Sequence, residues 1–206
     1  MRMVDDILKK LVFACAMLCV CVVETQAEDS SMSVMTFNIY RGGTMRGQPL
    51  TQTAKVILEA KADLVGLQEP RSPKGFNTEK LADLLGWNHS ANTKKGIILT
   101  PYEIVENLEG GVKVKLPSGQ HAYAFSLHLP SNPYQPYQLL GIRPKWYKHW
   151  DTPFLKTEDE AIEAAREARG GVISKLLEQI RDLPDKEAPV FVVGDFNTSI
   201  GQRKLL

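Results

Sequence analysis

Cysteine is almost absent from this sequence of 206 residues. All three cysteines, Cys15, Cys19 and Cys21, precede residue 28, so the chain from Glu28 onward contains none. Such a chain cannot form disulfide bonds or thiolate metal sites. Any metal ion would therefore be bound by oxygen atoms or by histidine.

An excess of charge of either sign is also lacking. The chain has 25 lysine and arginine residues against 24 aspartate and glutamate residues, a formal net charge of +1. Nonspecific binding to nucleic acid rests mainly on Lys and Arg contacts to phosphate. Nucleic acid therefore stays open as a partner but is not favoured by charge. A hydrophobic content of 43% is sufficient for one sizeable core, so we expect one domain.

Long hydrophobic runs are missing as well. The longest uncharged apolar run, Leu11–Val23, follows a lysine pair and precedes the small-residue cleavage sequence Thr25–Ala27. It would span about 20 Å as a helix, whereas a hydrocarbon core needs about 30 Å. We interpret residues 1–27 as a signal peptide rather than a stable membrane span, and the mature protein, beginning at Glu28, as secreted or periplasmic. No convincing lipobox precedes the cysteines, so lipidation is the weaker alternative.

Apolar runs and helical periodicity alternate along the rest of the chain, which predicts a mixed α/β fold with layered sheets. Strands are predicted at 33–37, 64–67, 97–99, 104–105, 112–116, 121–127 and 190–193. Helices are predicted around Ala54, Ile57 and Leu58, around Leu81, Leu84 and Leu85 with a stop at Gly86, and from Thr157 to Ile180. Gly170-Gly171 inside the last helix predicts close packing or a kink.

Polar residues follow four of the predicted strands. "SVMTFN" ends at Asn38, "DLVGLQE" at Glu69, "AYAFSLH" at His128 and "VFVVGD" at Asp195, with Asn197 two residues later. In α/β sheets, ligands gather outside the carboxyl ends of the strands. Carboxylate and amide oxygens suit Mg²⁺ or Mn²⁺, and histidine suits proton transfer. Taken singly, each residue also fits a turn, a cap or a satisfied buried imidazole.

Four sequence stretches in this order resemble the endonuclease/exonuclease/phosphatase family. They are "VMTFNIYRGG", "DLVGLQEP", "FSLHLP" and "VVGDFNTS", and the resemblance runs from about Ser33 to Ser199. "GIILTPYEIVE" resembles a further family segment, with its proline and isoleucine displaced. Each motif is weak alone, whereas four in the right order are specific.

The resemblance implies a four-layer α/β sandwich that hydrolyses phosphoesters with a divalent cation, Mg²⁺ or Mn²⁺. By this resemblance, Glu69 would bind the cation with Asn38 nearby. His128 would protonate or stabilise the phosphate. Asp195 and Asn197 would position the attacking water and the phosphate.

The sequence departs from the family pattern after Asn197. Family members usually continue to a Ser-Asp-His segment, whose histidine acts with the aspartate, and no histidine follows Asn197 here. We therefore expect residues 28–206 to form a domain that is truncated at its C-terminus, lacks its closing strands and has little or no activity. The function stays open between a phosphodiesterase, a phosphatase, a secreted nuclease and a non-catalytic binding module. The substrate and the oligomeric state are also open.

A loop rich in proline and aromatic residues, 129–156, separates His128 from the last helix. It is either a structural loop packed on the scaffold or a substrate platform. In the second interpretation, its aromatic rings and Arg143, Lys145 and Lys148 would stack on a base, a sugar or a lipid headgroup.

Overall fold

The structure is a computed structural model that describes residues 32–93, 96–143 and 153–198. The predicted signal peptide, the middle of the aromatic loop and residues 199–206 lie outside the described residues. Within those three ranges, no helix combines the length and the hydropathy that crossing a membrane requires.

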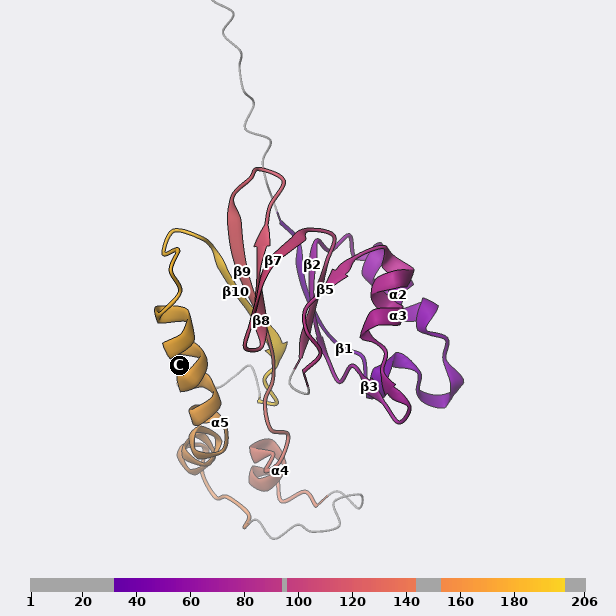
Figure 1. Cartoon of the computed structure of the whole chain (residues 1–206). Helices are drawn as coiled ribbons and strands as arrows, with labels where there is room; N and C mark the ends of the chain where they lie inside the picture. The colour runs from indigo at the N-terminus through magenta and orange to yellow at the C-terminus, as the bar shows by residue number, and fades with distance from the viewer. Residues whose placement is uncertain (1–31, 94–95, 144–152, 199–206) are drawn as a thin grey trace, which may run out of the picture. The chain divides into compact units, whose positions relative to one another are not determined.

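Two four-stranded mixed sheets lie at the centre of the fold (Figure 1). The first has the order β1-β2-β6-β5, with strands β1 (Val34–Asn38), β2 (Leu64–Gln68), β6 (Ile97–Thr100) and β5 (Asn88–His89). The second has the order β10-β9-β8-β7, with strands β10 (Val190–Asp195), β9 (His121–His128), β8 (Gly111–Lys115) and β7 (Glu103–Leu108). The pairs β1–β2 and β9–β10 are parallel. A small hairpin, β3 (Arg71–Ser72) and β4 (Gly75–Phe76), follows β2.

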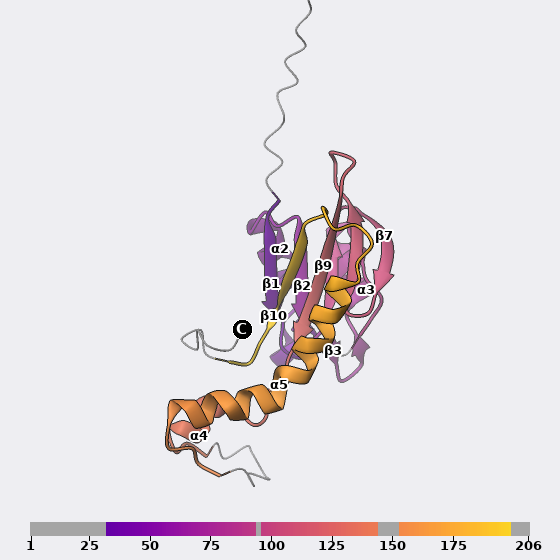
Figure 2. The same ribbon diagram turned by 90° about the vertical axis from the view of Figure 1, so that its left-hand side faces the viewer.

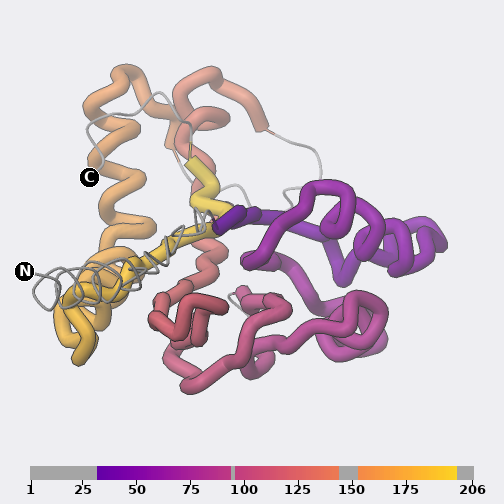
Figure 3. Tube along the Cα trace, turned by 90° about the horizontal axis from the view of Figure 1, so that it is seen from above, coloured from indigo at the N-terminus to yellow at the C-terminus, as the bar shows by residue number. Residues whose placement is uncertain are grey.

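Helices cover the outer faces of both sheets (Figure 3). Helices α2 (Leu50–Glu59) and α3 (Thr78–Leu85) supply Ile57 and Leu81 to the core on the first sheet. Helix α5 (Glu158–Arg181) packs Leu176 on the second sheet, and the short helix α4 (Gln135–Leu139) contacts α5. The layers are therefore helix, sheet, sheet and helix, which confirms the predicted α/β sandwich.

Strand β9 shows how the core fixes the register. Tyr123 and Phe125 are fully buried and pack toward α5, whereas Ala122 and Ala124 pack between the sheets. Since successive side chains on a strand point to opposite faces, the even-numbered side of β9 faces the first sheet. His128 ends that even-numbered row, so the register of β9 directs it toward the first sheet.

The structure refines several expectations. Both predicted helices are present, and Leu58 and Leu84, at 53% and 46% exposed, lie at their solvent edges. Apart from the adjacent residues and the nearby backbone of the helix itself, no heavy atom lies within 4 Å of a Cβ added at Gly170 or Gly171, so of the two predicted alternatives close packing is wrong. Figure 2 shows α5 bending part-way along its length, as the alternative of a kink predicts. The aromatic loop is partly helical, because it contains α4.

The predicted start of α5 is confirmed. The Thr157 hydroxyl accepts a hydrogen bond from the Glu160 amide at 3.2 Å, and the Glu160 carboxylate accepts one from the Lys156 amide at 2.7 Å. The first bond satisfies a backbone donor that the first helical turn leaves without a partner, and the second fixes the residue before the N-cap.

Candidate active site

The carboxyl ends of β1, β2, β9 and β10 meet in one place. Parallel pairing sets Asn38 opposite Gln68 in the first sheet and Asp195 opposite His128 in the second. Strands β1 and β10 contact each other and lie side by side in Figure 2. All five residues that the sequence nominated, Asn38, Glu69, His128, Asp195 and Asn197, therefore come from one edge of the sandwich.

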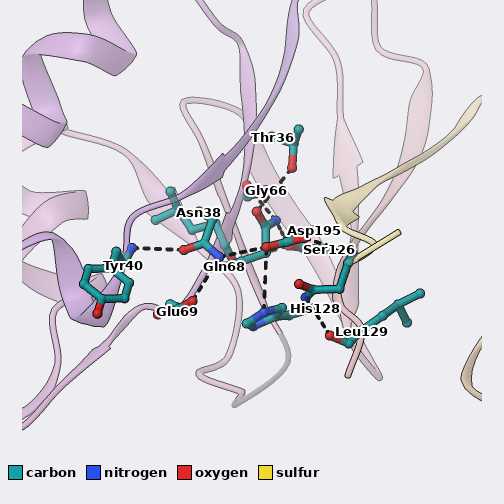
Figure 4. A network of polar contacts seen from close by, with 12 residues as sticks. Thr36, Asn38, Tyr40, Gly66, Gln68, Glu69, Ser126, His128, Leu129 and Asp195 are labelled. Carbon is teal, nitrogen blue, oxygen red and sulfur yellow. Dashed lines mark hydrogen bonds and ion pairs between the residues drawn. The ribbon is translucent and has the colours of Figure 1, made fainter. Parts of the chain in front are cut away.

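The Asn38 amide joins two carboxylates from different sheets (Figure 4). Its Nδ2 donates to Glu69 Oε1 at 3.1 Å and to Asp195 Oδ2 at 3.0 Å. Its Oδ1 accepts from the Tyr40 backbone amide at 3.0 Å, which determines which end of the amide faces the acids. The two carboxylates therefore converge on a single N–H₂ group.

Asp195 is also paired with His128. His128 Nε2 lies 3.9 Å from Asp195 Oδ2, and the two side chains are 22% and 32% exposed. Asp195 Oδ1 accepts from the Asn197 amide at 3.0 Å, and Asn197 Nδ2 donates to the Leu129 carbonyl at 2.9 Å. Both members of the His128–Asp195 pair are therefore partly exposed, and Asp195 is held by hydrogen bonds from the protein side.

A strained loop positions Glu69. The four residues Tyr40–Gly43 have φ values of 45°, 53°, 77° and 70°, and Glu69 itself has a φ of 55°. A non-glycine residue in this region costs about 1–3 kcal/mol. The Arg41 amide donates to Glu69 Oε2 at 3.2 Å, and the Gly42 amide donates to the Glu69 carbonyl at 2.8 Å. The loop backbone thus fixes both the main chain and the carboxylate of Glu69.

The buried side chain of Asn77 fixes the loop Tyr40–Gly43 by a hydrogen bond. It is 9% exposed, and its Nδ2 donates to the Gly42 carbonyl at 2.7 Å. A Cβ at Gly42 would lie 2.8 Å from the Ser72 amide nitrogen and 2.9 Å from Asn77 Nδ2, so only glycine fits there. Asn77 therefore determines how close the loop lies to Glu69.

We expect Asn77→Ala to lower the free energy of unfolding by about 1–3 kcal/mol, since it leaves a buried carbonyl without its donor. Denaturant unfolding measures this. Asn88→Ala is the matched control, because the exposed Asn88 amide donates to the Tyr102 carbonyl at 2.8 Å and its loss should cost far less. Equal losses for the two variants would contradict the role of Asn77.

A buried polar cluster lies beneath the acids. Gln68 is 1% exposed; its Nε2 donates to the Gly66 carbonyl at 3.0 Å and to Ser126 Oγ at 3.1 Å. Thr36 Oγ1 donates to Gln68 Oε1 at 3.3 Å. Gln68 thereby connects β1, β2 and β9 one residue before Glu69. Sequence reasoning missed Gln68, Tyr40 and Asn77, although a glutamine inside the apolar run "LVGLQ" was a readable signal for the first.

Comparison with known proteins determines the family. A model of the Endonuclease/Exonuclease/phosphatase family matches residues 35–202 of the chain. The chain belongs to this family. The family is one of phosphoester hydrolases, so the chain is a member of the phosphoesterase and nuclease superfamily.

Individual relatives agree on the fold. The chain is 26% identical over 197 residues to an uncharacterized protein of Caenorhabditis elegans, covering 82% of this chain and 54% of that protein. The chain thus spans about half the length of this curated relative. Two solved structures align with a TM-score of 0.51 and 13% identity: a β-hairpin deletion mutant of beta toxin from Staphylococcus aureus and SmcL. Each alignment covers 84% of this chain, and the covered shares of those chains are 69% and 65%. At that identity, both matches support the fold alone.

The donor atoms at this family site suit a hard cation. Within the described ranges there is no cluster of three or more His, Cys, Asp and Glu side chains that could hold a metal. The site instead supplies two carboxylates, Glu69 and Asp195, that already share one electropositive N–H₂ group. Mg²⁺ keeps several waters and is bound through one or two carboxylates plus substrate phosphate oxygens. The residues present therefore fit a hard divalent cation.

Proposed function

We propose that this protein hydrolyses phosphoester bonds with the help of a divalent cation, Mg²⁺ or Mn²⁺, held by Glu69 with Asn38 nearby. The observation that carries the proposal is the convergence of Glu69 and Asp195 on the Asn38 amide, with His128 beside Asp195. Membership of the family supports the same class of reaction.

The cation would neutralise charge on the phosphoryl oxygens and orient the substrate. Asp195 would accept a hydrogen bond from the attacking water, since its carboxylate is partly exposed and already fixed by Asn38 and the Asn197 amide. His128 would donate a hydrogen bond from Nε2 to a phosphoryl oxygen, which stabilises charge as the bond to the leaving alcohol breaks. Its Nε2 lies 3.9 Å from Asp195 Oδ2, so it is placed beside that carboxylate without being hydrogen-bonded to it.

We also propose that the protein is exported. The support for export is the predicted signal peptide at residues 1–27. The near-neutral charge does not favour duplex nucleic acid as the substrate, although nucleic acid stays open as a partner. The alternative function is a non-catalytic binding module, in which the same residues would bind a phosphoester without hydrolysing it.

A panel of substrates tests the proposal. The purified protein would be assayed on phosphomonoesters, phosphodiesters, sphingomyelin and single-stranded DNA, in excess EDTA and again after Mg²⁺ or Mn²⁺ is restored. We expect slow hydrolysis of one class, in keeping with the low activity expected without a histidine after Asn197, and EDTA should abolish it while the cation restores it. Tight binding of a phosphoester without turnover, with either cation, would reject the hydrolase and favour the binding module.

His128→Ala should abolish most hydrolysis while the melting temperature stays close to that of the parent. Its imidazole is at the solvent edge of β9 and contacts Asp195, so its loss leaves the buried row of β9 intact. His121→Ala is the matched control, since His121 begins the same strand at its opposite end. A His128 variant that is unstable but, when folded, as active as the parent would show a packing role instead.

A further inference from the structure

We propose that the Tyr40 ring forms a binding subsite for the alcohol part of the substrate, and that the favoured substrates are phosphoesters of ring-bearing alcohols such as nucleosides and sugars. This inference rests on the proposed function, because it places a subsite next to the phosphoryl site.

Tyr40 is bound to the site through its backbone. Its amide donates to Asn38 Oδ1 at 3.0 Å, and the next amide, that of Arg41, donates to Glu69 Oε2 at 3.2 Å. The residue therefore lies two positions after one proposed site residue, Asn38, and directly precedes Arg41, whose amide holds another, Glu69. A group bound at the acids lies within reach of an aromatic side chain at this position.

The Tyr40 side chain is directed outward rather than into the core. Tyr40 is 56% exposed, whereas Ile39 before it and Gly42 after it are both buried. Figure 4 shows the ring on the opposite side of Asn38 from His128. The ring therefore adds a flat apolar surface to one side of the site, and the core does not use it.

The backbone under Tyr40 is strained. Its φ of 45° and ψ of 104° fall outside the regions that a bulky side chain normally occupies, and glycine would adopt them at lower cost. Two hydrogen bonds at Gly42, two residues later, hold the loop in this conformation, since the Gly42 amide donates to the Glu69 carbonyl and Asn77 Nδ2 donates to the Gly42 carbonyl. A strained aromatic residue that contributes nothing to the core is explained by a contact outside the fold.

The chemistry of the ring selects the class of ligand. A tyrosine ring binds the flat face of a base by stacking and the C–H face of a sugar by apolar contact, and loss of such a stack typically weakens binding about 5- to 150-fold. An acyclic alcohol such as glycerol offers no such face. Tyr40 should therefore distinguish ring-bearing from acyclic phosphoesters without changing the affinity for phosphate itself.

Titration calorimetry in saturating Mg²⁺ tests the subsite with four probes: AMP, glucose 6-phosphate, glycerol 3-phosphate and inorganic phosphate. We expect the parent protein to bind AMP or glucose 6-phosphate about tenfold or more tightly than glycerol 3-phosphate, and the better of the two identifies the ring. Tyr40→Gly should reduce that affinity to the level of glycerol 3-phosphate and leave inorganic phosphate unchanged. Tyr40→Phe, which keeps the ring, should behave like the parent.

Thermal unfolding separates this role from a structural one. Because glycine relieves the strained backbone and the ring packs on no core residue, Tyr40→Gly should unfold at or above the temperature of the parent. Equal loss of affinity for all four probes, or equal affinity of the parent for ring-bearing and acyclic probes, would overturn the subsite and leave the proposed function standing. Failure of the parent protein to bind any of the four probes would count against both proposals.

Discussion

Asp195→Asn is expected to lower phosphoester hydrolysis by about 10²- to 10⁴-fold, the range that general acid–base assistance contributes. Asp195 accepts hydrogen bonds from Asn38 Nδ2 at 3.0 Å and from the Asn197 amide at 3.0 Å, and it pairs with His128. An asparagine has one acceptor oxygen instead of two, so its new N–H₂ group would face one of these donors. The variant therefore loses both the charge and the fixed orientation that the attacking water requires. Steady-state kinetics with the substrate found in the panel measure the loss.

The same substitution at Asp83 provides the control for Asp195. Asp83 lies on the exposed face of α3, so Asp83→Asn should retain the rate and the stability of the parent. The Asp195 variant should also keep a melting temperature near that of the parent, because its side chain is partly exposed. A rate within threefold of the parent would mean that Asp195 only joins the two sheets.

Glu69→Gln should weaken Mn²⁺ binding tenfold or more, and turnover should fall with it at limiting cation. Loss of even an outer-shell partner of a metal ligand costs about 10- to 100-fold in affinity, so loss of a ligand should cost at least as much. Glutamine is nearly isosteric and keeps an oxygen for the Arg41 amide, which now lies 3.2 Å from Glu69 Oε2. Electron paramagnetic resonance of free Mn²⁺ measures the affinity directly, without requiring activity.

Glu103→Gln is the matched control for this experiment. Glu103 is exposed on β7, the strand at the far side of the second sheet from β10. Its substitution removes the same charge and should leave Mn²⁺ affinity unchanged. If both variants weakened binding equally, general charge rather than Glu69 would account for the cation affinity.

The ends of the strands were predictable because the sequence changes there from apolar to polar. Each apolar run of β1, β2, β9 and β10 stops within one residue of a polar side chain, and parallel pairing then brings those ends together. The polar residues Asn38, Glu69, His128 and Asp195 could be nominated without knowing their contacts. Their hydrogen bonds could not, since the Asn38 amide bridges residues that lie 31 and 157 positions away.

The backbone geometry at Tyr40 and the presence of helix α4 could not be predicted from the sequence. The strain at Tyr40 depends on hydrogen bonds that the loop donates to Glu69 and accepts from Asn77, and neither residue is part of the stretch "NIYRGG". Helix α4 was not predicted, because the prolines of this segment indicate irregular structure. Pro136 lies in the first turn of α4, where proline is compatible with a helix. The described part of the aromatic loop is tied to α5, as Arg169 donates to Gln135 Oε1 at 2.6 Å. That contact supports the structural interpretation for this part of the loop.

The most direct test of the account is a crystal of the protein grown with Mn²⁺ and measured on both sides of the manganese absorption edge. The account predicts one strong anomalous peak bonded to the Glu69 carboxylate at the joined ends of β1, β2, β9 and β10. The peak should be absent from crystals of Glu69→Gln. A manganese ion bound elsewhere, with Glu69 still bonded only to Asn38 and the Arg41 amide, would contradict the account.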